Sequence, residues 1–279
     1  MRKLNHLFTI AISLATFLVV SAFIWLLWDL VAQGLDKLSW EFLSQAPKRS
    51  GREGGIWPMI VSTLWILIVA IAVVVPLGLG CAIWLAEFSR RDHHWQRHLG
   101  VVLDVLAGVP SIVFGLFGYA FFCVYLNLGF SILSGGLTLA CMMLPILIRT
   151  AEMGIAAVPN EWRQAGAALG ISRTTLLRKV ILPYAASAIT AGLLLAIGRA
   201  TAETAALIFT SGYVDRMPGS VNDSGRALAV HVYDLSMNVL GGDQAAYATA
   251  LVLISLIIAI NLGANLLSEY WVERRVQRL

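Results

Sequence analysis

Residues 157–184 read AVPNEWRQAGAALGISRTTLLRKVILPY, and this stretch predicts two short helices joined by a tight turn. Asn160 is a suitable N-cap for the first helix, because its side chain can accept a hydrogen bond from a free backbone N–H. Gly170 suits the left-handed residue that follows the end of a helix. Ser172 can then cap a second helix that ends before Pro183, which opens the next apolar run. The stretch is therefore expected to form a helical hairpin.

The same letters also resemble a DNA-binding helix-turn-helix, with Arg173 and Arg178 on the second helix. Only about 34 residues separate Arg149 from Pro183, too few for the third helix and small core that such a domain needs. Apolar runs also adjoin both ends of the stretch. We therefore favour a surface that docks another protein over DNA binding or a solvated basic loop without a partner.

Apolar runs fill most of the chain outside the hairpin. Of its 279 residues, 58% are hydrophobic and 13% are charged, whereas soluble proteins average about 25% charged residues. About 20 apolar residues in a helix cross a bilayer core. Six such helices are predicted, over residues 7–27, 56–85, 99–126, 136–157, 184–209 and 245–267, with the hairpin loop at 158–183. The sequence thus predicts an all-α integral membrane protein with one transmembrane domain over residues 1–279.

The first apolar run follows Arg2 and Lys3, as the apolar part of a signal peptide would. Its length of about 20 residues exceeds the roughly 7 to 15 that are usual for a signal peptide. We therefore expect an uncleaved membrane anchor.

Charge placement predicts the orientation, because Lys and Arg gather in segments that stay in the cytoplasm. With the N-terminus inside, the inside segments hold 13 of the 20 Lys and Arg residues and the outside segments hold 6, while Arg199 lies within a span. The inside group is Arg2, Lys3, Arg90, Arg91, Arg97, Arg149, Arg163, Arg173, Arg178, Lys179, Arg274, Arg275 and Arg278. Both termini and the hairpin are therefore expected on the cytoplasmic side of the plasma membrane.

The hairpin resembles the EAA coupling motif of ABC-importer permeases. That motif has the pattern E-A-A, three residues, G, nine residues, I, one residue and L-P. The corresponding positions here hold Gln164, Ala165, Gly166, Gly170, Val180, Leu182 and Pro183. The spacing is intact, while Gln replaces Glu, Gly replaces the second Ala and Val replaces Ile. The resemblance implies a type I ABC-importer permease fold, with these seven residues in a loop that couples to an ATPase.

Four further stretches extend the resemblance over nearly the whole chain after the first run. They are similar to the PstA family, the permease subunits of bacterial phosphate importers. The stretches are GGIWPMIVSTLWILIVAIAVVVPLGLGCAIWLAEFS from Gly54, GVPSIVFGLFGYAFF from Gly108, GGLTLACMMLPILIRTAE from Gly135 and GRATAETAALIFTSG from Gly198. The resemblance implies import of inorganic phosphate by alternating access. It also implies a heterodimer with a PstC-like permease, two PstB-like ATPase subunits and an extracytoplasmic phosphate-binding protein.

Two charged residues fall inside the fifth apolar run. An ionisable group at bilayer depth costs roughly 2.5–3.5 kcal/mol, so it needs a partner or a function. Arg199 lies 16 residues after Pro183, about 24 Å along a helix, and Glu203 follows four residues later on the same helix face. One hypothesis is an internal ion pair. The other is a substrate path, in which the guanidinium binds phosphate and the carboxylate accepts the proton of hydrogen phosphate.

Two further interactions are expected outside the membrane core, one at the end of an apolar run and one in an outside loop. Arg149 and Glu152 end the fourth run and are spaced to form a salt bridge at the membrane interface. His231, in the outside stretch ALAVHVYDL that also resembles the PstA family, is a candidate contact with the binding protein.

Metal and cofactor chemistry have little support. The three cysteines are dispersed in apolar runs and are expected to be core residues. His93, His94 and His98 in SRRDHHWQRH are close enough to bind a metal, but we expect a solvated basic loop near phospholipid headgroups. No metal or cofactor site is therefore predicted.

Energy coupling is expected from another subunit, because the chain has no G-x-x-x-x-G-K-[ST] loop for ATP. The sequence thus predicts a transport subunit without enzymatic chemistry of its own and without a nucleic-acid partner. Two alternatives remain open. The chain could serve another oxyanion, such as phosphonate, molybdate or sulfate, or it could be a stand-alone secondary transporter, against which the hairpin argues.

Overall fold

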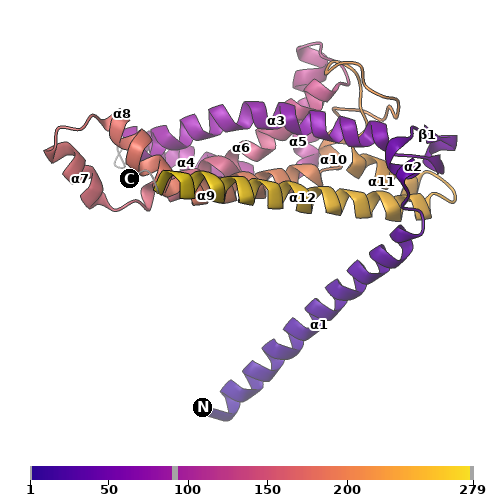
Figure 1. Cartoon of the computed structure of the whole chain (residues 1–279), viewed down its shortest axis with the longest axis horizontal. Coiled ribbons are helices and arrows are strands. Elements are labelled where there is room, and N and C mark those ends of the chain that lie inside the picture. Colours follow the sequence, from indigo (N-terminus) through magenta and orange to yellow (C-terminus); the bar gives the residue numbers. More distant parts are fainter. Residues whose placement is uncertain (1, 90–93, 277–279) are drawn as a thin grey trace.

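The computed structural model describes residues 2–89 and 94–276; within these ranges the side chains of residues 2–7, 94–96 and 267–276 are left out of the description. Helices make up most of the chain and form an elongated bundle, from which the first helix diverges (Figure 1). The longer helices are α1 (Arg2–Leu35), α3 (Trp57–Ile83), α4 (His94–Gly108), α6 (Ile132–Ala156), α9 (Leu182–Thr201) and α12 (Asp243–Val276). The shorter ones are α2 (Trp40–Ser44), α5 (Ser111–Gly118), α7 (Asn160–Ala168), α8 (Arg173–Leu176), α10 (Ala205–Ile208) and α11 (Leu228–Met237).

Three π-helical segments and a small β-hairpin are the remaining regular elements among the described residues. The segments η2 (Trp84–Phe88), η3 (Tyr119–Tyr125) and η4 (Leu177–Ile181) continue α3, α5 and α8. Strands β1 (Pro47–Lys48) and β2 (Glu53–Gly54) pair antiparallel around the 3₁₀ turn η1 (Arg49–Gly51). The π-helical turns widen the helix locally without ending it.

Five helical stretches within the described residues are long and apolar enough to cross a bilayer. They are Phe8–Leu35, Trp57–Phe88, Ile132–Ala156, Arg173–Thr201 and Asp243–Leu266. A sixth candidate is a broken pair, Arg97–Gly108 and Ser111–Tyr125, whose two parts meet at an angle of 99°. The span expected over residues 99–126 thus corresponds to two helices that bend sharply at their junction.

The bend lies at Val109 and Pro110. Proline has no N–H to donate, and it disfavours helical geometry in the residue before it, so a helix tends to end there. Pro76 and Pro145 have the same chemistry but lie inside the unbroken helices α3 and α6. A proline alone thus permits a break in a membrane helix, and the packing around it determines the angle.

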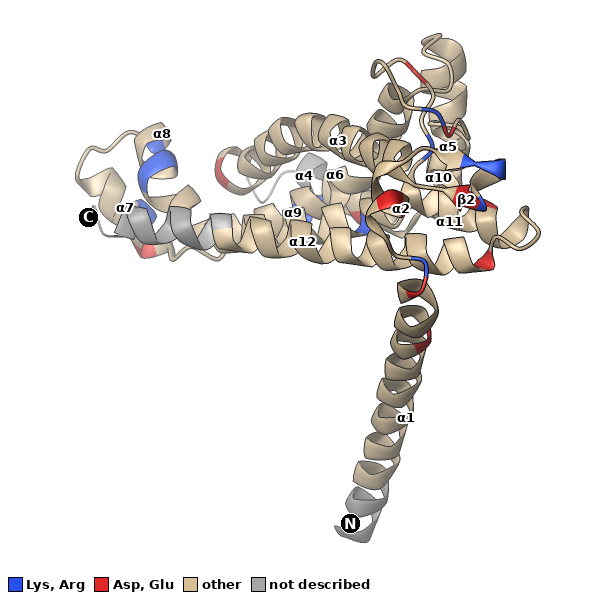
Figure 2. Cartoon of the chain, turned by 45° about the vertical axis from the view of Figure 1, so that its right-hand side comes forward, with Lys and Arg blue, Asp and Glu red and all other residues tan. Residues whose placement is uncertain are grey.

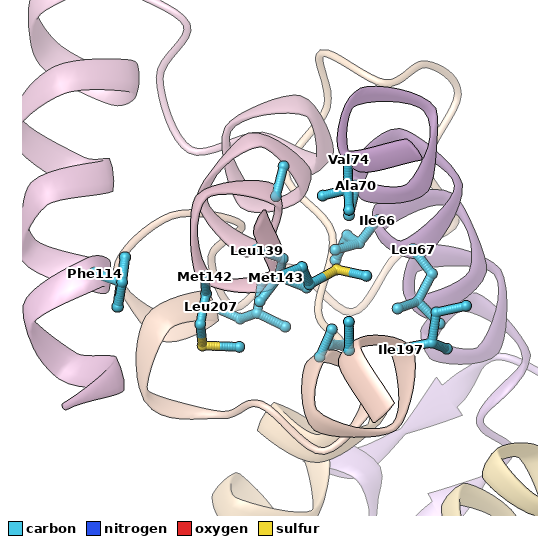
Figure 3. Close-up of a cluster of buried hydrophobic side chains, with 14 of the residues drawn as sticks. Ile66, Leu67, Ala70, Val74, Phe114, Leu139, Met142, Met143, Ile197 and Leu207 are labelled. Carbon is cyan, nitrogen blue, oxygen red and sulfur yellow. The ribbon is translucent and has the colours of Figure 1, made fainter. Parts of the chain in front are cut away.

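Helix α6 is the centre of the bundle and packs against α3 on one side and α9 on the other. Figure 3 shows the core that these helices share. Ile66, Leu67, Ala70 and Val74 come from α3, Leu139, Met142 and Met143 from α6, Ile197 from α9, Leu207 from α10 and Phe114 from α5. Burying each large apolar side chain contributes on the order of 1.5–3 kcal/mol against an aqueous reference.

Glycines allow α6 to approach both of its neighbours closely. A Cβ on Gly136 would lie 2.5 Å from Val69 of α3, and a Cβ on Gly192 of α9 would overlap Thr150 of α6. Membrane helices associate largely through such close packing of small residues, because lipid gives no hydrophobic drive between helices. The glycine-rich sequence therefore specifies the tight α3, α6 and α9 core.

Helix α1 contacts the rest of the chain near its C-terminal end and otherwise points away (Figure 1). The Tyr247 hydroxyl donates to Asp29 at 3.3 Å, and Gly34 lies against the Tyr247 backbone. The apolar window of this helix is wholly unburied within the chain. Lipid or another subunit must cover such a surface in a membrane.

The two ends of the bundle differ in structure and charge. The hairpin end carries α7, α8 and η4, and the loop end carries β1, η1, β2 and α11 (Figure 1). Figure 2 shows Lys and Arg on α8 at the hairpin end and charges of both signs around β2, while the middle of α12 is uncharged. The charges thus lie mainly outside the apolar middle, as expected of a membrane protein.

Candidate functional site

The predicted hairpin lies between α6 and α9. Gly170 follows α7 and takes the left-handed conformation, with φ of +68°. The Ile171 N–H donates to the Gly166 carbonyl at 2.9 Å and closes the turn. Ser172 caps α8 by accepting a hydrogen bond from the Thr175 N–H at 3.3 Å. Gly170 and Ser172 therefore have the roles that the sequence predicts.

The start of the hairpin differs from the prediction. Helix α7 begins at Asn160, and Pro159 is its N-cap, so the Asn160 side chain does not cap the helix. Pro159 has φ of −54° and ψ of 135°, an extended conformation from which the helix begins. Glu161 lies in the first turn, where the helix dipole favours a negative charge.

The second arm of the hairpin also differs from the prediction, because it does not end before Pro183. Helix α8, segment η4 and helix α9 run without interruption from Arg173 to Thr201. The Leu182 N–H donates to the Leu177 carbonyl five residues earlier, in a π-type turn that leads into Pro183. The second arm is thus the direct extension of a membrane helix, and a displacement of the hairpin acts on α9 without a flexible joint.

The seven motif residues form an exposed group and a packed group. Gln164, Ala165 and Gly170 are exposed on α7 and at the turn. Gly166 is buried, and a Cβ on it would lie 3.0 Å from both terminal methyl groups of Leu176. The close contact between α7 and α8 explains why a residue without a side chain fits here.

The remaining motif residues, Val180, Leu182 and Pro183, are half-buried where the hairpin meets the membrane helices. We call this region the hairpin root. Its buried residues are Ile155, Val158, Leu177, Ile181 and Ala185, and the partly buried Ile83, Ala86, Leu176, Leu182 and Ile189 pack against them. The root therefore joins the ends of α3 and α6 to the second arm of the hairpin.

Large apolar side chains are exposed on the hairpin. Leu169 is 76% exposed, and Trp162 and Ile171 are also exposed. Apolar groups gathered on a small surface element outside the membrane mark a site for another protein. The hairpin thus presents three large apolar side chains on its surface.

Arg163 anchors the hairpin to the rest of the chain, an interaction that the sequence analysis did not identify. Its guanidinium donates to the Glu87 carboxylate at 2.6 and 3.0 Å, and to the carbonyls of Val158 at 2.6 Å and Ile155 at 2.9 Å. Glu87 belongs to η2, 76 residues earlier in the chain. No sequence pattern links residues so far apart, although an Arg in a hairpin near a span suggests that an acidic partner exists.

Arg149 joins α4 to α6 at the same end of the bundle. It forms the expected salt bridge with Glu152 at 3.0 Å and a second one with Asp104 of α4 at 2.6 Å. It also donates to the Gly100 carbonyl at 2.8 Å. The predicted Arg149–Glu152 pair is confirmed, and its larger role is to hold the bent helix pair against α6.

Arg199 and Glu203 lie on either side of a helix break. Helix α9 ends at Thr201, and α10 begins at Ala205, so the predicted helix over residues 184–209 is interrupted. Glu203 is 8% exposed and accepts a hydrogen bond from the Ala206 N–H at 3.2 Å. Arg199 is exposed and has no hydrogen-bond or ion-pair partner among the described residues.

The ion-pair hypothesis for these two residues is therefore wrong for the described chain. Glu203 uses its carboxylate to cap α10, and the Arg199 guanidinium is free to meet a group from outside the chain. A break in a membrane helix leaves backbone groups unpaired and is tolerated where it lines a cavity or a protein interface. Residues 202–204, which include Glu203, and the nearby Arg199 thus make a candidate site for an anion.

His231 is buried at the loop end and is 1% exposed, so it is not itself a contact with another protein. Arg226 bonds to Asp234 at 2.8 Å and lies 3.3 Å from His231 Nδ1. Because an Arg can only donate, Nδ1 accepts and the proton is on Nε2. Burial, and then the charge of Arg226, lower the pKa of His231 to about 4. His231 is therefore a neutral support beneath the charged loop.

Metal-binding groups do not gather in the structure as far as it is described. No cluster of three or more His, Cys, Asp or Glu side chains that could hold a metal occurs among the described residues. His93 lies outside the described residues and the side chain of His94 is not described, so the histidine-rich loop stays a prediction.

The family to which this architecture belongs is given by the sequence itself. Residues 75–278 match the family model of the binding-protein-dependent transport system inner membrane component. The chain belongs to this family. The matched region includes the hairpin, its root and the helix break, so the candidate sites lie within the part that defines these permeases.

Individual permeases of the family are similar over most of the chain. The phosphate transport system permease protein PstA 1 of Mycobacterium tuberculosis is 31% identical over 258 residues, which cover 90% of this chain and 84% of that protein. A probable ABC transporter permease protein, YqgI of Bacillus subtilis, is 29% identical and covers 85% of both chains. PstA of Haemophilus influenzae is 28% identical and covers 88% of this chain and 87% of its own.

Solved permease structures share the fold. A chain of a bacterial ABC transporter involved in import of the acidic polysaccharide alginate has a TM-score of 0.64 at 13% identity, covering 92% of this chain and 95% of its own. An inward-facing MetNI methionine ABC transporter gives a TM-score of 0.59 at 15% identity, covering 77% of this chain and 96% of its own. The predicted type I ABC-importer permease fold is confirmed.

Membership of the family also settles the type of subunit. The chain is an inner-membrane permease subunit of an ABC importer, and ATP hydrolysis belongs to a separate ATPase component. An importer of this family also requires a substrate-binding protein.

Proposed function

We propose that the permease imports inorganic phosphate across the plasma membrane by alternating access, driven by a partner ATPase. The observation that carries this proposal is the 31% identity to the phosphate transport system permease protein PstA 1 over 90% of the chain. A permease for another oxyanion would share the fold but would not be expected to share sequence over the whole transport domain with phosphate permeases. A stand-alone secondary transporter would have no use for the hairpin.

The proposed assembly follows from the same relationship. A PstC-like permease would complete the transmembrane pair, and two PstB-like ATPase subunits would bind one hairpin each. The exposed surface of α1 supports such a partner, since a long apolar helix that leaves its own bundle needs another surface or lipid to cover it. An extracytoplasmic phosphate-binding protein would deliver the substrate to the loop end.

The proposed orientation in the membrane is supported by the distribution of Lys and Arg and by the cytoplasmic location of ATP. Thirteen of the 20 Lys and Arg residues would be cytoplasmic if the hairpin end faces inward. ATP is a cytoplasmic substrate, so a hairpin that binds an ATPase must face the same way. Both termini would then be cytoplasmic.

The anion path is proposed at the break between α9 and α10. Arg199 is exposed and free of partners within the described chain, so its guanidinium can bind two oxygens of a phosphate. Glu203 holds the break open by capping α10, and its carboxylate would accept the proton that hydrogen phosphate carries and sulfate lacks. Arg199 would thus bind the charge of the anion, while Glu203 would shape the site and accept the proton.

Uptake in cells tests the proposal. The permease with its neighbouring transporter subunits would be expressed in a bacterial strain that lacks its own phosphate importers, and uptake of radiolabelled phosphate and sulfate would be measured. We expect phosphate uptake that disappears when the ATPase is inactivated. Uptake of sulfate or molybdate in place of phosphate would instead identify a permease for another oxyanion.

A further inference from the structure

Arg163 connects three elements at the hairpin end of the bundle. It belongs to α7, bonds to Glu87 in η2, and donates to two carbonyls at and just beyond the end of α6. The Ile155 carbonyl also accepts from the backbone N–H of Val158 at 3.3 Å, so the guanidinium adds a side-chain link to the turn that ends α6. The Nε–H and Nη2–H groups both donate to Oε1 of the Glu87 carboxylate, at 3.0 and 2.6 Å, and Nε–H also approaches Oε2 at 3.4 Å, in a charge-assisted contact.

The Arg163–Glu87 pair differs from an ordinary surface salt bridge. The Glu87 side chain is 14% exposed and the Arg163 side chain is 23% exposed. Exposed ion pairs contribute little because water screens them and long side chains lose freedom. Arg163 has further donors bonded to backbone carbonyls, so this partly buried pair is held in one geometry and can carry a displacement from one element to another.

Only two membrane helices, α6 and α9, adjoin the hairpin in the sequence. Helix α7 follows α6 directly, and α8 continues into α9. Helix α3 does not adjoin the hairpin in sequence, although Ile83 at its end and Ala86 in η2 pack in the root. Arg163 therefore provides the charged contact that attaches α3 to the moving element.

We propose that the Arg163–Glu87 pair transmits movement of the hairpin to α3, so that α3, α6 and α9 move together when the ATPase closes. This inference rests on the proposed function, in which the hairpin docks the ATPase. Arg163 is then a positioning residue: it contacts neither ATP nor phosphate, and it sets how far ATPase closure reaches into the membrane core. Without the pair, hydrolysis would continue while α3 responded incompletely.

Glu87→Gln is the selective test, because Arg163 keeps its contacts to the carbonyls of Ile155 and Val158 and the hairpin keeps its exposed surface. The whole complex would be purified with its ATPase, reconstituted into liposomes with the binding protein, and assayed for ATP hydrolysis and phosphate uptake. We expect normal ATPase retention, continued hydrolysis, and a fall of about tenfold in phosphate transported per ATP, as for loss of a charged hydrogen bond.

Glu152→Gln is the matched control. It removes another partly buried Arg–Glu pair at the same end of the bundle, but that pair lies within the single helix α6, and Arg149 keeps Asp104 as a partner. Phosphate transported per ATP should therefore be unchanged. A similar fall in both variants would mean that any lost pair at this end disturbs transport, and would overturn the assigned link.

Arg163→Lys tests the same pair from the other side. The lysine keeps the charge but cannot bond to the carboxylate and both carbonyls together. We expect the same direction of change, with the ATPase still bound. An unchanged ratio of transport to hydrolysis in Glu87→Gln would overturn the inference, and so would loss of ATPase binding in Glu87→Gln and Arg163→Lys, since the pair would then only maintain the docking surface.

Failure of the underlying function has a different signature. If the hairpin did not dock the ATPase, a complex carrying Gln164→Asp and Leu169→Asp would still retain its ATPase. If phosphate were not the substrate, the wild-type liposomes would not accumulate it. Neither result depends on Glu87.

Discussion

The backbone of Gly166 lies directly against the side chain of Leu176, so closely that a methyl group on Gly166 would come within 3.0 Å of both Leu176 Cδ atoms. This contact fixes the distance between the two arms of the hairpin. The EAA motif has alanine at the position of Gly166. The arms are therefore closer here than an alanine would allow without a shift of Leu176.

Substitutions at Gly166 should reveal this spacing. Gly166→Ala should change the melting temperature little, because Leu176 is half-buried and can move slightly while the helix gains up to about 1 kcal/mol of propensity. Gly166→Val should destabilise the hairpin by about 1–3 kcal/mol through overpacking and weaken ATPase retention. Leu176→Ala added to Gly166→Val should restore retention; if it does not, the contact does not set the hairpin geometry.

The low pKa of His231 predicts a pH-dependent stability. The folded pKa of about 4 lies below the ordinary 6.5, so between these values the unfolded chain binds a proton that the folded chain does not. Stability should therefore be constant above pH 6.5 and fall as the pH drops toward 4, by a total on the order of 3 kcal/mol. The melting temperature in detergent, measured at pH 7.5 and pH 5, checks this.

His231→Gln is the control for the pH experiment. A glutamine oxygen can accept from Arg226 but cannot titrate, so the variant should lose less stability between the two pH values. Equal losses in both proteins would assign the pH dependence to another group.

The orientation can be measured with single cysteines. Ser50, Ser220 and Thr174 are all exposed, so each should react once the reagent reaches its side of the membrane. In a background without Cys81, Cys123 and Cys141, an impermeant thiol reagent added to intact cells should label Ser50→Cys and Ser220→Cys but not Thr174→Cys. Thr174→Cys should become reactive after the cells are opened, and its labelling in intact cells would reverse the proposed topology.

Arg199 and Glu203 should affect different properties. Arg199→Gln should assemble and support ATP hydrolysis but reduce phosphate uptake at least tenfold, and Arg199→Lys should recover little because an ammonium lacks the fork. Glu203→Gln should lower stability by about 1 kcal/mol, because a neutral amide is a weaker cap for α10 than a carboxylate. The uptake rate and the melting temperature separate the two effects. Near wild-type phosphate uptake by a variant that combines Arg199→Gln and Glu203→Gln would exclude both residues from the anion path.

The parts of the structure that depend on neighbouring residues could be predicted from the sequence. Gly170 and Ser172 form the turn of the hairpin through contacts within a few residues, and the apolar runs predict the membrane helices. The helix break after Thr201 could not be predicted from the sequence, since residues 199–205 (RATAETA) contain neither glycine nor proline. It arises because the Glu203 side chain occupies the Ala206 N–H, a competition between side chain and backbone that sequence spacing alone does not decide.

Contacts between distant segments could not be predicted either. Arg163 and Glu87 are 76 residues apart, and their pairing depends on how α3 and α6 pack. The 99° bend likewise depends on where α4 and α5 find partners, because Pro76 and Pro145 cause no such bend in their helices. Tertiary packing thus decides which of several locally allowed geometries is used.

Phosphate accumulation by the reconstituted complex is the strictest test of ATP-driven phosphate import by this permease. The permease would be purified with its permease partner and ATPase, placed in liposomes, and supplied with the binding protein outside and ATP inside. We predict accumulation of phosphate against its gradient that requires ATP hydrolysis and is not reduced by excess sulfate. ATP-dependent uptake of another oxyanion without phosphate uptake, or phosphate movement that needs no ATPase, would contradict the account.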